Sequence, residues 1–280
     1  MDALPQDQRL ISLAAGVVQE FPPEDVVVAA AQAGFNAVGI WCDLATWTNE
    51  RTHNVIKAIA ETGITVLDIE VAWLQPGEPA DSQDRFIEIA KTINAKNILC
   101  VSSEPNISDT KKRFKRLCTL TEGSDIRIVL EFLAITEIDT LDKALEVITD
   151  VAHPAGGILI DSLHLQRTGS DVGDVAKLAQ QSVASRLRPR ARLLPYLQLC
   201  DASKTLKDGS TEGILEDALY LRQLPGDGEL PLKDTLQAIG PDMPISLEIR
   251  SRALNEQFPD LQDRANAVFE RTQQFLSTLS

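Results

Sequence analysis

Residues 126–131, Ile-Arg-Ile-Val-Leu-Glu, and residues 157–161, Gly-Ile-Leu-Ile-Asp, are two short apolar runs that each end in a carboxylate. Strands of a parallel sheet have this composition because helices cover both faces of the sheet. Both runs are therefore predicted to be buried β-strands, and they set the pattern against which the rest of the chain can be compared.

The same alternation of apolar runs and amphipathic stretches extends along all 280 residues. Eight strands separated by helices predict parallel βαβ units, and a chain of this length favours a closed (β/α)8 TIM barrel of α/β class as one domain over residues 1–280. A doubly wound open sheet is the alternative. The predicted strands are 10–17, 37–42, 65–72, 97–101, 127–133, 157–161, 196–200 and 245–249, and the predicted helices are 22–34, 48–63, 82–95, 110–120, 140–152 and 260–279.

Two regions depart from this regular pattern. Residues 168–195 carry no clear helix signal where the sixth helix of a barrel belongs. Residues 201–230 form the longest insertion, between the seventh and eighth predicted strands. Neither region has the composition of a linker, so no domain boundary is predicted.

The charge balance excludes some classes of partner. The formal net charge is −14, whereas nucleic-acid-binding proteins carry basic surfaces that neutralise phosphates. The densest basic stretch, Arg186, Arg188, Arg190 and Arg192, is short and is interpreted as a solvated surface, with a local phosphate or partner contact as the alternative. We therefore expect no nucleic-acid partner.

The cysteines and the chain start favour a cytoplasmic location. Cys42, Cys100, Cys118 and Cys200 include no CxxC pair, and most lie within or beside apolar runs, as buried free thiols do in a reducing compartment. The first residues lack the pattern of a signal peptide, and no apolar run approaches membrane-spanning length. No membrane association is expected.

Polar residues near the carboxyl ends of the predicted strands are the candidate site, because barrel active sites lie at that face. Strands five to eight offer Glu131, Asp161, Gln198 and Glu248. A buried carboxylate normally pairs or becomes neutral, and several at one barrel mouth would repel each other unless a cation lay between them. For any single residue, pairing with an arginine or capping of a loop is the alternative reading.

These residues are where the chain resembles the xylose-isomerase-like barrel superfamily of sugar phosphate isomerases and epimerases. The resemblance rests on Leu-Glu-Phe at 130–132, Asp-Ser-Leu-His at 161–164, Leu-Gln-Leu-Cys-Asp at 197–201, and Ser-Leu-Glu at 246–248. The most specific stretch is Leu-Pro-Gly-Asp-Gly-Glu-Leu-Pro-Leu at 224–232. The similarity spans the whole chain and is strongest from residue 126 onward.

The resemblance implies a metal site made of Glu131, Asp161, Gln198 and Glu248. Gln198 stands where most members have His and is similar to the Gln of hydroxypyruvate isomerases. Oxygen ligands alone suit Mg²⁺ or Mn²⁺ better than Zn²⁺, so one such divalent cation is the expected cofactor. The alternative for Gln198 is a barrel-lining amide that binds substrate.

Other polar and aromatic residues are candidates for substrate contact. In the family the residue at the position of His164 faces the substrate, and Glu70 and Trp41 end the third and second strands. Lys204 and Arg222, in the insertion, could hold an anionic group, or could be solvated loop charges. Trp73 is as consistent with packing as with a pocket wall, Asp201 is expected to cap a loop, and His53 and His153 are expected to lie away from the site.

The predicted function is that of a metal-dependent isomerase or epimerase of a small keto sugar or related hydroxy-ketone, with Glu131 and Glu248 transferring protons through an enediolate. A dehydratase is the first alternative, and an accessory or ligand-binding barrel is the second. An endonuclease for abasic DNA would need many more metal-binding histidines than the three present. A homodimer is possible, and whether the substrate is phosphorylated stays open.

Overall fold

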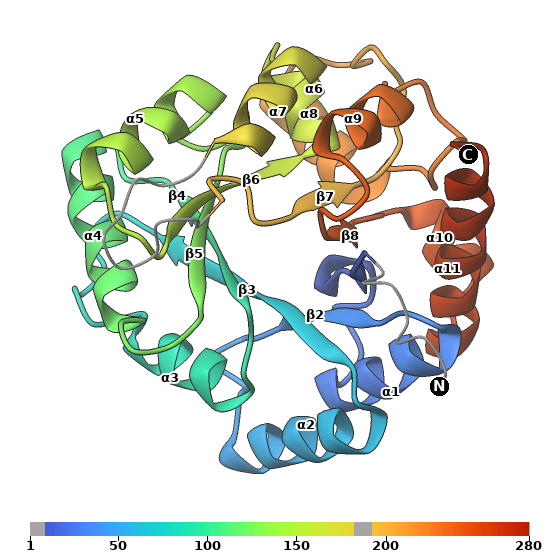
Figure 1. The fold of residues 1–280 in the computed structure, drawn as a ribbon, viewed down its shortest axis with the longest axis horizontal. Coiled ribbons are helices and arrows are strands. Elements are labelled where there is room, and N and C mark those ends of the chain that lie inside the picture. Colours follow the sequence, from blue (N-terminus) through green and yellow to red (C-terminus); the bar gives the residue numbers. More distant parts are fainter. Residues whose placement is uncertain (1–8, 182–191, 280) are drawn as a thin grey trace, which may run out of the picture.

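The protein is a closed parallel barrel, as the computed structural model shows for residues 9–181 and 192–279, which are the residues it describes (Figure 1). Each strand pairs with its successor in the chain, and β8 pairs with β1. The predicted barrel is confirmed, and the open sheet is excluded. The strands are β1 (Ile11–Leu13), β2 (Ala37–Trp41), β3 (Thr65–Leu74), β4 (Asn97–Ser102), β5 (Arg127–Glu131), β6 (Gly156–Asp161), β7 (Leu197–Leu199) and β8 (Ile245–Leu247).

Helices surround the barrel on its outer face (Figure 1). All six predicted helices are present, and their ends agree with the predicted ones to within a few residues. The described helices are α1 (Pro23–Ala33), α2 (Asn49–Thr62), α3 (Asp84–Thr92), α4 (Ile107–Leu120), α5 (Leu141–Val151), α6 (Ser162–Arg167), α7 (Val172–Gln180), α8 (Thr211–Tyr220), α9 (Leu232–Ile239), α10 (Arg252–Gln257) and α11 (Leu261–Ser277).

Local capping explains where several helices begin and end. The Thr48 side chain accepts a hydrogen bond from the Arg51 backbone N–H and starts α2. Gly63, with φ of 69°, ends α2 in the left-handed conformation that glycine adopts without steric cost. At the carboxyl end of β6, the Asp161 carboxylate accepts from the N–H groups of Leu163 and His164 and starts α6.

The first predicted strand is shorter than expected. β1 ends at Leu13, and residues 15–17 form a short 3₁₀ helix, η1 (Ala15–Val17), instead of continuing the strand to residue 17. Gly16 lies in η1, and a Cβ atom there would come within 2.2 Å of the Glu248 carboxylate. The chain therefore turns at this point and leaves space for a side chain that comes from β8.

Two hydrophobic cores hold the barrel together. A small core fills the barrel interior and includes Leu67, Val129, Leu159 and Tyr196. A larger core lies between the sheet and the surrounding helices. The side chains of one strand thus contribute alternately to the two cores, which explains the nearly continuous apolar runs in the sequence.

The structure also shows where the cysteines, His53 and His153 lie. All four cysteines are free and buried, as expected. His53 is exposed on α2, and His153 contacts Glu122 at the amino-terminal side of β6, so both lie away from the strand ends that form the site. Of the basic stretch, Arg186, Arg188 and Arg190 lie outside the described residues. In the described part of the chain, there is no helix long and apolar enough to cross a membrane.

Candidate active site

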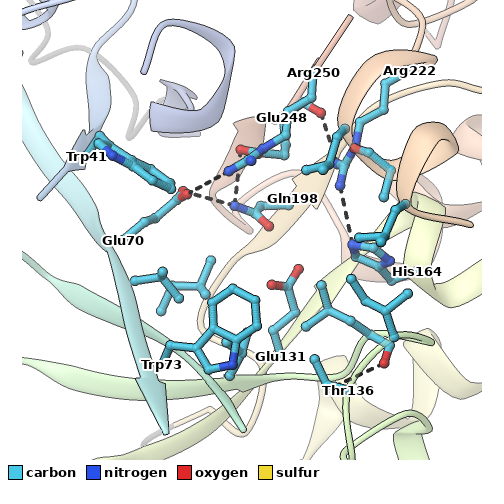
Figure 2. Close-up of a pocket in the computed structure, with 18 residues that line it drawn as sticks. Trp41, Glu70, Trp73, Glu131, Thr136, His164, Gln198, Arg222, Glu248 and Arg250 are labelled. Carbon is cyan, nitrogen blue, oxygen red and sulfur yellow. Dashed lines mark hydrogen bonds and ion pairs between the residues drawn. The ribbon is translucent and has the colours of Figure 1, made fainter. Parts of the chain in front are cut away.

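A cavity of about 190 Å³ lies at the carboxyl ends of the strands. Its floor is polar, and its walls include the apolar side chains of Leu99, Leu133, Leu215 and Leu219 together with the rings of Trp41 and Trp73 (Figure 2). Leu215 and Leu219 belong to α8, inside the insertion between β7 and β8. The long insertion therefore builds part of the pocket, as barrel loops at this face commonly do.

Glu131, the last residue of β5, points into the pocket (Figure 2). Its carboxylate is buried and has no hydrogen-bond partner among the described residues. Burial raises the pKa of Glu131 well above its usual value, and repulsion from Asp161 adds to the rise while Arg222 opposes it. A carboxyl group with a raised pKa keeps its proton to a higher pH than a free one, and such groups are candidates for proton transfer.

Asp161 and Arg222 form a buried ion pair beside Glu131. The Arg222 Nη1 atom lies 2.6 Å from Asp161 Oδ2. It also donates a hydrogen bond to the Glu248 carbonyl oxygen (Figure 2). Burial alone would raise the pKa of Asp161, but Arg222, His164 and the hydrogen bonds that the carboxylate accepts together hold the pKa below its usual range. Asp161 is therefore ionised and fully hydrogen-bonded within the protein.

His164 is held in its neutral form next to this ion pair. Burial lowers the pKa of His164 to about 4, and the cations of Arg222 and Arg250 add to this effect while Asp161 opposes it. The Arg222 Nη2 atom lies 3.3 Å from His164 Nε2, and a guanidinium can only donate. His164 Nε2 is thus the acceptor, and the imidazole proton is on Nδ1.

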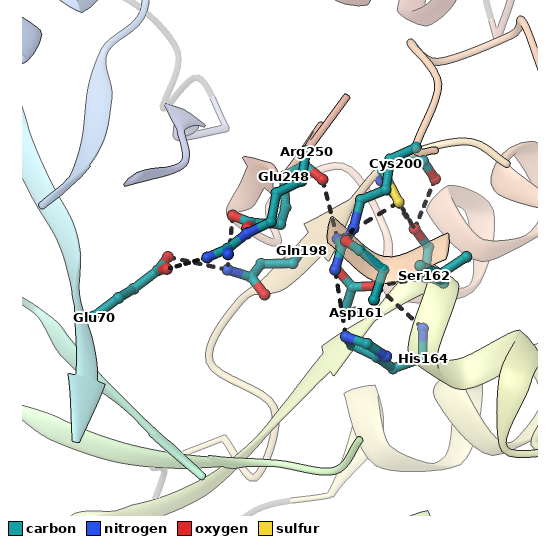
Figure 3. Close-up of polar contacts among 11 residues, drawn as sticks. Glu70, Asp161, Ser162, His164, Gln198, Cys200, Glu248 and Arg250 are labelled. Carbon is teal, nitrogen blue, oxygen red and sulfur yellow. Dashed lines mark hydrogen bonds and ion pairs between the residues drawn. The ribbon is translucent and has the colours of Figure 1, made fainter. Parts of the chain in front are cut away.

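Glu248 is held from two sides at the end of β8. The Arg250 Nε atom donates to Glu248 Oε1 at 2.6 Å, and the Gln198 Nε2 atom lies 3.4 Å from Glu248 Oε2. The same Gln198 amide donates to Glu70 Oε1 at 3.2 Å (Figure 3). Gln198 thus links two carboxylates, and its amide nitrogen, not its oxygen, faces them.

Glu70 completes the floor from β3. Burial raises the pKa of Glu70 well above its usual value, and the nearby Glu248 and Asp68 carboxylates raise it further. Arg250 opposes this rise from 3.8 Å, the distance between its Nη2 atom and Glu70 Oε2. The predicted candidate Glu70 therefore belongs to the same electrostatic cluster as Glu131 and Glu248.

The structure brings most of the predicted residues to one place. Glu70, Glu131, His164, Gln198, Glu248, Trp41 and Arg222 line the pocket, and Asp161 lies directly behind Arg222. Lys204 is exposed and does not line the cavity, and its backbone instead contacts Glu229 and Arg167. Its placement gives no support to the predicted substrate contact.

The insertion motif at 224–232 forms a loop whose backbone is hydrogen-bonded to the Asp201 side chain. This buried carboxylate accepts hydrogen bonds from the backbone N–H groups of Ala202, Gly226 and Leu230, so its expected capping role is confirmed. A Cβ atom on Gly228 would lie 2.4 Å from Asp201 Oδ1. The motif therefore shapes the loop and provides no group of its own to the pocket floor.

Three ionisable residues at or just below the pocket were not predicted. Arg250 lines the pocket, and Asp68 and Tyr196 are buried one layer below it. Each lies two residues from a predicted site residue in the sequence. Because alternate residues of a strand share a face, a spacing of two was the signal that could have identified them.

The donor atoms at the pocket suit a divalent cation in their chemistry. Glu70, Glu131, Asp161 and Glu248 are buried carboxyl groups that lie near Arg222 and Arg250. Carboxylate oxygens are donors that Mg²⁺ and Mn²⁺ prefer.

In the described part of the chain, these donors are not arranged as a metal site. Among residues 9–181 and 192–279, the structure contains no group of three or more His, Cys, Asp or Glu side chains placed to hold a metal ion. Asp161 contacts Arg222 instead, and Glu248 contacts Arg250. The predicted ligand set thus stays a prediction, with two of its carboxylates engaged by arginines.

The chain belongs to the xylose isomerase-like TIM barrel family, whose model matches residues 27–278. This agrees with the resemblance found in the sequence. No curated protein matches the chain.

Several solved structures share the fold. One is a fusion of a xylose isomerase-like TIM barrel with a 4-hydroxyphenylpyruvate dioxygenase (TM-score 0.76, 18% identity), and the match covers 97% of this chain but only 43% of the fusion protein. Another is the IOLI protein with a bound zinc atom (TM-score 0.72, 17% identity, covering 96% of this chain and 99% of that one). A third is a probable 3-DHS dehydratase, AsbF, from Bacillus anthracis (TM-score 0.68, 17% identity, covering 94% and 98%). At these identities the likeness establishes the fold alone.

Proposed function

We propose that this protein is a divalent-metal-dependent isomerase or epimerase that acts on a small keto sugar or related hydroxy-ketone by proton transfer next to the carbonyl group. The observation that carries the proposal is that Glu131 and Glu248 line one pocket from strands on different sides of the barrel. β5 and β8 are three strands apart in a ring of eight, so the two carboxyl groups approach a bound molecule from different directions.

The two carboxyl groups are prepared for different roles. Glu131 lacks a hydrogen-bond partner among the described residues and has a raised pKa, which suits a group that gains and loses a proton during the reaction. Glu248 is held by Arg250 and Gln198, which fixes its position. Return of the proton to the same carbon from the other face gives an epimer, and return to the neighbouring carbon gives an isomer.

Other residues would bind and orient the substrate. His164 carries its proton on Nδ1 and can donate it to a hydroxyl or carbonyl oxygen, provided that this edge of the ring reaches the bound molecule. Trp73, Leu133 and Leu219 would form apolar walls around the bound molecule. Loss of a β-hydroxyl group from the same enediolate would make the reaction a dehydration.

Glu131, Asp161, Gln198 and Glu248 are the residues that would hold the cation, and Mg²⁺ or Mn²⁺ is favoured by their oxygen donors. When bound, such an ion supplies a Lewis acid that stabilises negative charge on the substrate oxygens. The IOLI structure, which shares the fold, contains a bound zinc atom, and this supports a divalent cation as the cofactor.

The proposal is tested by exchange of substrate protons with solvent deuterium. The Mn²⁺-supplemented protein is incubated in D₂O with a panel of keto sugars and hydroxy-ketones, and deuterium uptake and products are read by NMR and mass spectrometry. We expect uptake by the wild type and a loss of about 10²-fold or more in Glu131→Gln and Glu248→Gln. Glu61→Gln, an exposed change on α2, is the matched control and should keep full activity.

Two results would overturn this function. Full activity in both pocket variants would remove their proposed role. A wild-type protein that is loaded with metal yet inert across the panel would instead favour an accessory or ligand-binding barrel. Metal content, measured by elemental analysis of the protein and of Glu131→Ala, separates these readings.

A further inference from the structure

The two pocket arginines differ in how firmly they are held. Arg222 has a side chain only 4% exposed and donates to the Ala218 and Glu248 carbonyl oxygens as well as to Asp161. Arg250 has a side chain 17% exposed and lies at the pocket edge. Arg222 is therefore held by more partners than Arg250 and is less exposed.

Arg250 lies between two carboxylates and an aromatic ring. Its Nε atom is 2.6 Å from Glu248 Oε1, and its Nη2 atom is 3.8 Å from Glu70 Oε2 (Figure 3). The centre of its guanidinium is 5.5 Å from the centroid of the Trp41 ring, a distance at which a cation is attracted to the ring face (Figure 2). A second anionic partner is thus already close to the guanidinium.

Gly16 provides the space in which the Arg250–Glu248 pair lies. A Cβ atom at this position would come within 2.2 Å of Glu248 Oε1 and within 2.3 Å of Arg250 Nε. The ion pair therefore packs directly against the backbone of η1. The contact is a built feature of this conformation and not a chance approach of two surface chains.

We propose that Arg250 is a displaceable internal cation: it neutralises Glu248 while no divalent ion is bound, and it moves to Glu70 when such an ion takes Glu248 as a ligand. This inference rests on the proposed metal-dependent function. A guanidinium and a divalent cation repel each other strongly at contact distance in a buried site, so both cannot share one carboxylate at full affinity. The displaced Arg250 guanidinium then pairs with the Glu70 carboxylate, and the Trp41 ring stabilises it there.

The first test is the affinity of the full-length protein for Mn²⁺, measured by electron paramagnetic resonance. Because Arg250→Gln removes the competing charge, we expect it to bind Mn²⁺ at least tenfold more tightly than the wild type. Arg250→Lys keeps the charge and should stay close to the wild type. Arg252→Gln removes a neighbouring arginine that contacts Tyr220 on the surface, and it is the matched control with unchanged affinity.

A double-mutant cycle tests the role of Glu70. Glu70→Gln removes the acceptor, so it should weaken Mn²⁺ binding in the wild-type background. In the Arg250→Gln background, no guanidinium is displaced toward residue 70. The same change should therefore weaken Mn²⁺ binding much less. Equal effects of Glu70→Gln in the two backgrounds would overturn the assignment of Glu70 as the acceptor.

A second measurement uses the wild-type protein, so it does not depend on whether the Arg250→Gln variant folds. The arginine Nε–H signals of the wild type are followed by ¹⁵N NMR during titration with Mg²⁺, with Arg250 assigned from the Arg250→Lys spectrum. We expect the Arg250 signal to shift with saturation and the signal of the surface residue Arg252 to keep its position. An unchanged Arg250 signal at Mg²⁺ saturation would overturn the inference.

The outcomes separate this inference from the function on which it rests. If the wild type binds Mn²⁺ and Arg250→Gln binds it no more tightly, the inference fails and the metal-dependent function stands. If neither protein binds Mn²⁺, the metal requirement fails, and the inference fails with it.

Discussion

Asp161 and Arg222, which are 61 positions apart in the sequence, form an ion pair with an Nη1–Oδ2 distance of 2.6 Å and side chains that are 0% and 4% exposed. Asp161 also starts α6, and Arg222 follows α8 directly, so the pair joins the end of β6 to the insertion between β7 and β8. One buried contact therefore connects the pocket floor to the segment that forms part of its wall.

Replacement of Arg222 by Met should destabilise the protein strongly, because Asp161 would be left buried without its cation. Loss of one partner from a buried pair costs about 3–5 kcal/mol of unfolding free energy. Thermal and urea unfolding measure the effect. The Arg222→Met/Asp161→Asn protein should recover part of the loss, and Arg252→Gln, on the surface, should stay near the wild type. A loss below about 1 kcal/mol would contradict a structural role for the pair.

His164 should remain neutral throughout the physiological pH range, because burial lowers its pKa from the usual 6.5 to about 4. An unfolded chain binds a proton to this residue below pH 6.5, and the folded one does not. Its contribution to stability is thus present above pH 6.5 and is lost as the pH falls toward 4. NMR titration of the imidazole provides the check, and an inflection near pH 6.5 would be the contrary result.

Asp68 should have the opposite pH dependence. Burial raises its pKa to about 7, with the Tyr196 hydroxyl opposing the rise and Glu248 adding to it. The folded state thus favours the protonated acid, and the associated stability is fully present below pH 3.8 and is lost as the pH rises through 7. Asp68→Asn should raise the unfolding temperature more at pH 8 than at pH 5. A gain that is equal at the two values would show that Asp68 does not titrate in this way.

Gly228→Ala should disrupt the loop at 224–232. The added Cβ would meet the Ala202 backbone nitrogen and oxygen at 2.6 Å, and backbone atoms cannot rotate away as a flexible side chain can. Overpacking of this kind costs about 1–3 kcal/mol. Gly209→Ala, in the same insertion but with no atom within 4 Å of the new Cβ, is the matched control. Similar unfolding temperatures for the two variants would contradict this account.

The fold could be read from the sequence because parallel strands appear as short apolar runs, and the carboxylates that end them were identified in the same way. The carboxyl end of β1 could not be read, since residues 14–18 are as apolar as a strand, yet the chain turns at η1, where Glu248 and Arg250 occupy the space next to Gly16. The apolar pattern of one segment does not reveal that side chains from a distant part of the chain need the space beside it.

The partners of the site residues were also beyond the sequence. Arg222 was considered as a contact for an anionic group, and it lines the pocket, but its closest anion is Asp161. The fold, not a local pattern, decides which carboxylate lies next to which arginine. α8 was not predicted for a related reason. It belongs to an insertion that covers the barrel mouth, and such an insertion has no fixed place in the alternation of strands and helices.

The insertion has ends that are tied together. Asp201 and Gln223 exchange backbone hydrogen bonds of 2.9 and 2.8 Å, so the segment between them leaves the barrel and returns at one point. Leu215 and Leu219, which shape the pocket wall, lie inside that segment, whereas the carboxylates of the floor lie on the strands outside it. Exchange of residues 202–221 would change this wall and leave Arg222 and the floor carboxylates in place, which makes the segment a suitable unit to replace when the pocket is redesigned.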